Sequence, residues 1–175
     1  MKKLFTTAFV LCLSVIVFAQ SKEAGTEREA LKQFMTKDNT LPVSPKAKDE
    51  ETVRSVLKLY NSAVEKLDVT GTEKLFTADS KIYESGGSEG SYAHYMEHHL
   101  APELKEFKSF NFSDYKVDVT VSDEYAFSTE TYIYTLVLAK DGKEIKSKGV
   151  ATSVLKKTTE GWKILSTHSS FRKAK

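Results

Sequence analysis

Histidine is scarce in this 175-residue chain, and three of its four histidines stand within six residues. His94, His98 and His99 lie in the segment SYAHYMEHHLAPEL, and His168 lies in ILSTHSSFR near the C-terminus. Imidazole titrates near neutrality and binds transition metals, so these residues are candidates for acid–base chemistry or for a metal site. The alternative explanation for the cluster is an ordinary solvated helix surface.

A helix over the histidine cluster would bury only one of the three rings, because consecutive residues turn by about 100°. One side would carry mainly apolar residues: Tyr92, Tyr95, Met96, His99 and Leu100. His94 and His98 are four residues apart and fall together on the flank, where we expect a surface pair. His99 is therefore expected to face the interior, either in a pocket or as a hydrogen-bonded core residue.

The fourth histidine belongs to a predicted C-terminal strand, in which alternate residues point to opposite faces. Simple alternation gives one face Trp162, Ile164, Ser166, His168 and Ser170. The other face receives Lys163, Leu165, Thr167, Ser169 and Phe171. Neither face is cleanly polar, so the direction of His168 stays open. In the short predicted strand SKIYES, Tyr83 and Glu84 point to opposite faces, so at most one of them faces inward.

The elements that position these residues follow from hydrophobic periodicity. Residues 49–68 have apolar residues at helical spacing, which predicts a long amphipathic helix with one buried face. A second short helix is predicted over 72–77, and Gly86-Gly87 predicts a turn. Pro102 is expected to end or kink the histidine helix. Four later runs of β-branched and aromatic residues predict an antiparallel meander, so the whole is an α+β domain.

The first 19 residues have the pattern of a secretory signal peptide, with two lysines before an uncharged apolar run that ends at Ala19. The run is shorter than the roughly 20 residues of a membrane span. Lipidation at Cys12 is the alternative. Residues 20–48 lack a sustained apolar face and are predicted to form a flexible arm before a domain at 49–175. We therefore expect a periplasmic or secreted protein with no stable membrane span.

Charge and cysteine content exclude several kinds of site. The chain has 26 Lys and Arg against 24 Asp and Glu, and loss of Lys2 and Lys3 with the signal peptide leaves 24 against 24. A formally neutral chain argues against general nucleic-acid binding, which needs a basic surface. Cleavage after Ala19 also removes the single cysteine. Disulfides and thiolate ligands are then excluded, and a metal would need imidazole and carboxylate.

The order of these segments resembles the nuclear transport factor 2-like superfamily, which includes ketosteroid isomerase and SnoaL-like polyketide cyclases. The resemblance covers residues 49–171 and is carried by VRSVLKLYNSAVEKLD, EKLFTADSKIYESGG, the helix after it and GWKILSTHSSF. It implies a cystatin-like α+β cone, in which a curved antiparallel sheet wraps round the N-terminal helices and leaves a pocket at one end. It also implies a homodimer through the outer face of the sheet. It does not imply a reaction, because one fold hosts many functions.

In relatives with a similar closing pattern the histidine and serine line the cavity, which implies that His168 and Ser170 do so here. The expected pocket residues are His99, His168, Ser170, Glu84, Tyr83, Tyr60 and Tyr95. The tyrosine-rich run TYIYTLVLA fits either a pocket wall or a dimer face.

Three functions fit such a pocket. The preferred one is binding of a small, partly apolar ligand. The second is a zinc or copper site built from His99, His168, Glu84 and His98. The third is ketosteroid isomerase-like acid–base chemistry on a small organic substrate, with Glu84 as the partner base of His168.

Overall fold

The computed structural model describes Lys32 and residues 44–174. The predicted signal peptide, the cleavage point and most of the predicted arm lie outside the described residues. In the described part, no helix has both the length and the apolar character that crossing a membrane requires.

The predicted long helix is present as α2 (Pro45–Glu65). The side-chain oxygen of Ser44 caps it by accepting a hydrogen bond from the Ala47 amide at 3.1 Å. Pro45 occupies the first helical turn, where its missing N–H is not needed. The helix therefore begins before Asp49, within the stretch that was predicted to be an arm.

The segment after α2 is more extended than predicted. The short helix expected over 72–77 is one 3-10 turn, η1 (Thr72–Leu75), and Phe76 already opens the strand β1 (Phe76–Glu84). Phe76 belongs to the sheet because it pairs with Ile164 of the last strand, where both side chains are buried. The predicted glycine turn is followed by a short strand, β2 (Gly87–Gly90), which pairs with β1.

The histidine segment is helical throughout, but it is not one regular α-helix. It consists of α3 (Tyr92–Tyr95), a π-helical turn η2 (Met96–Leu100) and α4 (Ala101–Lys105). The hydroxyl of Ser91 caps it by accepting from the His94 amide. Pro102 does not end the helix, because it falls in the first turn of α4 just after the π-helical turn.

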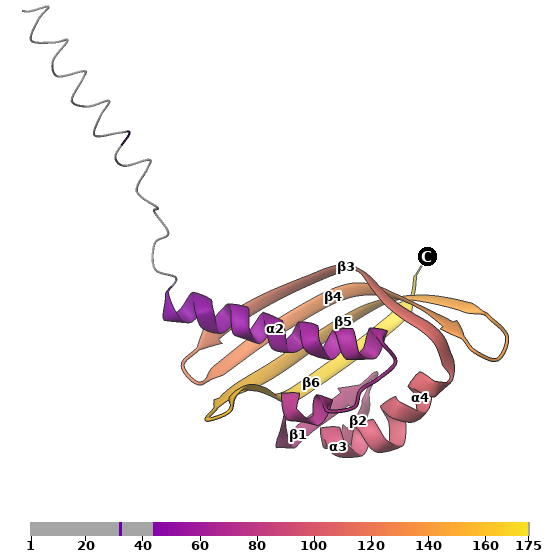
Figure 1. Ribbon diagram of the computed structural model, residues 1–175, viewed down its shortest axis with the longest axis horizontal. Coiled ribbons are helices and arrows are strands. Elements are labelled where there is room, and N and C mark those ends of the chain that lie inside the picture. Colours follow the sequence, from indigo (N-terminus) through magenta and orange to yellow (C-terminus); the bar gives the residue numbers. More distant parts are fainter. Residues whose placement is uncertain (1–31, 33–43, 175) are drawn as a thin grey trace, which may run out of the picture. The chain divides into compact units, whose positions relative to one another are not determined.

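The predicted four-stranded meander is confirmed as β3 (Phe107–Ser122), β4 (Tyr125–Leu138), β5 (Glu144–Thr158) and β6 (Gly161–Lys173). With β1 and β2 it forms one six-stranded sheet in the order β2-β1-β6-β5-β4-β3. All neighbours are antiparallel except β1 and β6, which are parallel. The sheet is curved and unclosed, and α2 crosses its inner side (Figure 1). The predicted α+β fold is confirmed.

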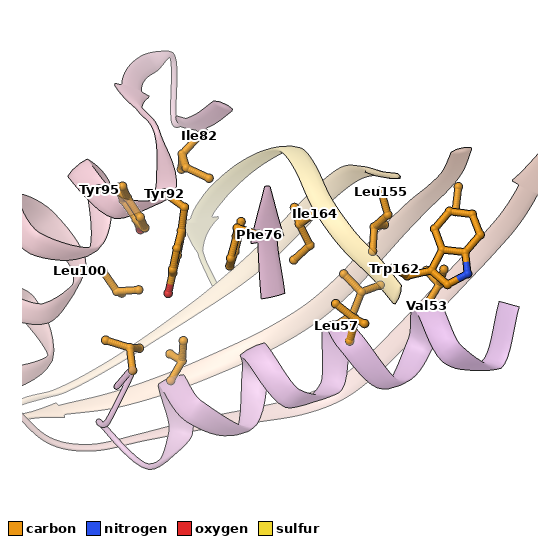
Figure 2. Close-up of a cluster of buried hydrophobic side chains, with 14 of the residues drawn as sticks. Val53, Leu57, Phe76, Ile82, Tyr92, Tyr95, Leu100, Leu155, Trp162 and Ile164 are labelled. Atoms are coloured by element: carbon orange, nitrogen blue, oxygen red, sulfur yellow. The ribbon is translucent and has the colours of Figure 1, made fainter. Parts of the chain in front are cut away.

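Helix α2 is held against the sheet by apolar packing and by polar contacts at its N-terminal half. Val53 and Leu57 are buried beside Leu155, Trp162 and Ile164 of the sheet (Figure 2). The carboxylate of Asp49 accepts from Lys157 Nζ at 2.7 Å and from Trp162 Nε1 at 3.0 Å. Arg54 donates to the Val117 carbonyl of β3. These contacts fix the helix across β3, β5 and β6.

A β-bulge in β6 changes which residues of that strand face inward. Leu155 of β5 pairs with Ile164, but the preceding residue, Val154, pairs with Ser166. Leu165 is therefore the extra residue in β6. A bulge of one residue shifts the alternation of side chains by one position. Ile164 faces the core before the bulge, and Thr167 faces inward after it.

Candidate functional site

A cavity of about 390 Å³ lies between α2, the α3–α4 segment and the inner face of the sheet. Its size falls within the range of about 300–1,000 Å³ that is usual for small-molecule sites. Most of the lining is apolar or aromatic, and the polar lining groups are few. They are Asn61, Glu84, Glu103, Glu130, Ser153, Thr167 and Ser169, together with the tyrosine hydroxyls.

The aromatic wall of the cavity is formed mainly by β3 and β4. The ring of Phe110 stacks on Tyr134 with centroids 5.3 Å apart, and Phe112 meets Tyr132 edge-on at 5.0 Å. Gly149 on β5 makes room for one of these rings, because a Cβ there would stand 2.1 Å from an atom of Tyr132. The wall is therefore preformed by strand pairing and by one close backbone approach.

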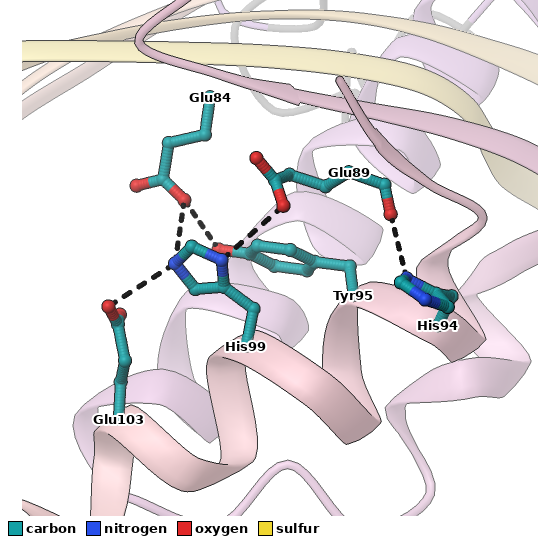
Figure 3. A network of polar contacts seen from close by, with 6 residues as sticks. All are labelled: Glu84, Glu89, His94, Tyr95, His99 and Glu103. Carbon is teal, nitrogen blue, oxygen red and sulfur yellow. Dashed lines mark hydrogen bonds and ion pairs between the residues drawn. The ribbon is translucent and has the colours of Figure 1, made fainter. Parts of the chain in front are cut away.

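At the end formed by β1 and the helices, Glu84 and His99 form the centre of a polar network (Figure 3). The hydroxyl of Tyr95 donates to Glu84 at 3.1 Å. His99 Nε2 lies 3.7 Å from Glu84 and 3.2 Å from Glu103, and its Nδ1 lies 3.4 Å from Glu89. A protonated His99 can donate to these carboxylates from both ring nitrogens, whereas a neutral ring has one N–H and can donate from one nitrogen only.

The same network changes the protonation behaviour of its members. Burial raises the pKa of Glu103, the charges of Glu84 and Glu89 add to the rise, and His99 opposes it. Burial and the neighbouring Glu84 raise the pKa of Tyr95 well above its ordinary value, so this hydroxyl stays a donor. The arrangement can therefore offer a proton acceptor, a proton donor and an imidazole within a few ångströms.

A second polar group, centred on Glu130 of β4, lies deeper in the protein. Glu130 is only 4% exposed, and its carboxylate accepts hydrogen bonds from Tyr115 at 2.6 Å and from Asn61 at 3.1 Å. Tyr115 reaches it from a bulge in β3, where Asp114 has a positive φ of 51°. Burial raises the pKa of Glu130, and these two hydrogen bonds partly offset the rise.

The expected cavity residues are divided between the two faces of the sheet. Glu84, Tyr60 and Tyr95 line the cavity. His99 does not line it but contacts Glu84 and Glu103, which do. The prediction that at most one of Tyr83 and Glu84 faces inward is consistent with this arrangement, because Tyr83 is 40% exposed on the opposite face.

The expectation that His168 and Ser170 line this cavity is corrected. Both are exposed, whereas Thr167 and Ser169 line the cavity. The cause is the bulge at Leu165, which places His168 opposite Thr152 and Tyr83 on the outer face. Ser170 lines a separate hollow of about 600 Å³. The two imidazoles that were expected to share a pocket therefore lie on different surfaces.

The four expected metal ligands are not brought together as one set, because His99 lies 3.7 Å from Glu84 but His98 and His168 lie elsewhere. His98 is exposed beside Glu97, and its ring lies 4.6 Å from that of His94, which agrees with the predicted surface pair. His168 is on the other face of the sheet from Glu84 and His99. Across residues 44–174 and Lys32, no group of three or more His, Cys, Asp or Glu is arranged to hold a metal ion.

Reasoning from the sequence missed Glu103 and Glu130. The signal for Glu130 was available, because alternation in TETYIYTL puts Glu130, Tyr132 and Tyr134 on one face of a strand. That face was open to two interpretations, pocket wall or dimer face. It is the inner face, and both tyrosines line the cavity.

Comparison with known proteins agrees with this architecture. The family model of the SnoaL-like domain matches residues 53–173. No curated protein sequence matches the chain significantly.

Several solved structures are similar in fold. A nuclear transport factor 2-like superfamily protein from Salmonella enterica serovar Typhimurium LT2 is 18% identical with a TM-score of 0.64, covering 74% of this chain and 94% of its own. A Shewanella frigidimarina NCIMB 400 protein, provisionally named a ketosteroid isomerase, is 28% identical with a TM-score of 0.57, covering 68% and 94%. A nuclear transport factor 2-like protein with a cystatin-like fold from Novosphingobium aromaticivorans is 13% identical with a TM-score of 0.56, covering 70% and 81%. The chain belongs to the SnoaL-like domain family, and its fold is the one found in nuclear transport factor 2-like proteins.

Proposed function

We propose that this protein binds a small, partly apolar organic molecule in the cavity between α2 and the sheet. The observation that carries the proposal is the cavity itself, which has an aromatic wall on β3 and β4 and polar groups at two separate places. Such a site buries an apolar body and orients it through a few hydrogen bonds. Tyr95 and Asn61 already hold the two principal carboxylates in place, so the polar groups are positioned before a ligand arrives.

Narrowing the cavity tests this proposal. The probes are three indoles with one ring system and different ends: tryptamine, indole-3-ethanol and indole-3-propionate. We expect isothermal titration to detect binding of at least one of them. Ala151→Leu, which places a larger side chain on the cavity wall, should weaken that binding about tenfold or more, equivalent to about 1.4 kcal/mol.

The matched control is Thr152→Leu, which enlarges the side chain of the next residue of the same strand, on the exposed outer face. It should leave the affinity unchanged. The proposal fails if no probe binds the wild-type protein, or if Ala151→Leu and Thr152→Leu behave alike.

A second candidate function is proton transfer to or from the bound molecule. The observation in its favour is that the cavity holds carboxyl groups in different environments, with burial raising the pKa of Glu130 and of Glu103. A carboxyl group whose pKa is raised by burial can hold a proton nearer neutral pH, which is what a general acid requires. Glu84, in contact with both Tyr95 and His99, is the acceptor that we assign to this role.

The raised pKa of Glu130 has a measurable consequence for stability. Between the ordinary carboxyl pKa and the raised value, the native state binds more protons than the unfolded state, so stability falls as pH rises through that window. Each unit of difference between the two pKa values corresponds to about 1.4 kcal/mol. The free energy of unfolding is measured by urea denaturation at a series of pH values. Glu130→Gln should make it fall less steeply with pH, and the raised pKa of Glu103 should account for the dependence that remains.

Glu124→Gln is the control for that experiment, because Glu124 is exposed in the turn between β3 and β4. It should follow the wild-type curve. Equal slopes for the wild-type protein and Glu130→Gln would contradict the raised pKa of Glu130 and exclude this residue as a proton-transfer group.

We also propose that two copies pair through the outer face of the sheet. Phe127 and Val150 are 50% and 44% exposed on outward positions of β4 and β5. Large apolar side chains on an exposed sheet face are typical of an interface. We expect a dimer by sedimentation velocity, and Val150→Lys should shift the protein to monomer.

Leu59→Lys provides the comparison, because Leu59 is 59% exposed but lies on α2. It should sediment as the wild-type protein does. A wild-type monomer at tens of micromolar, or dissociation by both variants, would rule out this interface.

We propose further that the protein is exported, on the basis of the signal-peptide pattern in residues 1–19. Expression of the full chain in a Gram-negative bacterium should yield exported protein whose first residue is Gln20. A mature protein that retains residues 1–19, or one lipidated at Cys12, would refute the predicted cleavage after Ala19.

A further inference from the structure

In the part of the chain that the structure describes, the cavity is lined by acidic side chains and by no basic ones. Its carboxyl groups are Glu84, Glu103 and Glu130, and among the described residues that line it none is Lys, Arg or His. His99 contacts Glu84 and Glu103 at the edge of the lining. If it is protonated it offsets one of three carboxylates, and if it is neutral it offsets none. Whether His99 is protonated or neutral, the described residues therefore give the cavity too little positive charge to balance its ionised carboxyl groups.

Glu130 is the carboxylate with the greatest need of a counter-charge. It is 4% exposed, and its two hydrogen-bond donors, Asn61 and Tyr115, are both neutral. Within the described residues, no Lys, Arg or His forms an ion pair with it. A buried carboxylate without a cation is unfavourable, and an opposite charge beside it would favour its ionised form.

The surroundings of Glu130 are aromatic. Tyr60 and Tyr132 line the same cavity as Glu130, and the hydroxyl of Tyr115 donates to the Glu130 carboxylate at 2.6 Å. Phe112 meets the ring of Tyr132 edge-on at 5.0 Å. Aromatic faces attract cations and also pack against flat apolar groups. A carboxylate and several rings at one place suit a molecule that is both cationic and apolar.

We propose that the ligand of this cavity is an organic ammonium with a flat apolar body, whose charged end pairs with Glu130 and whose body lies against the aromatic wall. This inference rests on the proposed binding function, since it names the class of molecule for the same cavity. A carboxylated or phosphorylated molecule would meet three carboxyl groups and no basic lining residue. A bare metal ion would leave the aromatic wall unused.

The three indole probes separate this inference from the binding function itself. We expect tryptamine to bind the wild-type protein at least about tenfold more tightly than indole-3-ethanol, with indole-3-propionate the weakest. If the alcohol or the acid binds as tightly as the amine, the ammonium proposal is wrong and the binding function stands. If none of the three binds, both are wrong.

Replacing the proposed partner of the ammonium tests the assignment to one residue. Glu130→Gln keeps the size of the side chain and its acceptor for Tyr115, so it should weaken tryptamine binding about tenfold or more while changing indole-3-ethanol binding by less than about twofold. Glu124→Gln should change neither. Equal effects of Glu130→Gln on the amine and the alcohol would exclude Glu130 as the ammonium site. Folding of each variant is checked by circular dichroism, and the wild-type ranking decides the ligand class even if Glu130→Gln does not fold.

Discussion

The packing of α2 across the inner face of the curved sheet is the contact on which the rest of the structure depends. An isolated helix of this length is marginal in water, and a sheet with one apolar face needs a cover. Val53 and Leu57 meet this need at one end, where both are buried among residues of β5 and β6. Leu57 also borders the cavity, as do Tyr60, Asn61 and Val64 farther along α2. The packed end gives stability, and the open end gives the site.

The character of the site follows from where its polar groups come from. Glu84 ends β1, Glu103 lies on α4 and Glu130 is in the middle of β4, so three separate elements each bring a carboxyl group to one cavity. Neutral donors hold two of these groups, and the surrounding apolar walls raise the pKa of Glu103 and Glu130. Binding and proton transfer are therefore related possibilities, because a ligand that enters the cavity necessarily meets groups whose protonation is sensitive to burial and to charge.

Membership of the SnoaL-like family explains the architecture but leaves the chemistry to the individual chain. The solved structures compared above share the fold at 13–28% identity, a level at which pocket residues are free to differ. In this chain the site contains a deeply buried Glu130 with neutral partners and a His99 that contacts three carboxylates. Both features are built from side chains on several elements, so neither appears as a short motif.

Much of the fold could be predicted from the sequence because its signals are local. Helical spacing in residues 49–68 predicts α2, alternation predicts the meander, and the apolar side of the histidine helix separates the half-buried His99 from the exposed His94 and His98. The start of α2 and the start of β1 were misjudged because a single residue type allows two structures. Pro45 can break a helix or begin one, and Phe76 suits either a helix or a strand.

The sequence by itself determined the long helix, the four-stranded meander, the family and the separation of His99 from the surface pair His94 and His98, since periodicity alone fixes which residues share a side. Only the tertiary structure decided the contents of the cavity. The bulge at Leu165 reverses the alternation of β6, so Thr167 faces inward and His168 faces outward, and no local pattern marks that extra residue. Glu130 is buried because β4 lies under α2 and beside the β3 bulge that carries Tyr115. Burial and partnership of this kind arise between segments distant in sequence, which is why they appear only when the chain is folded.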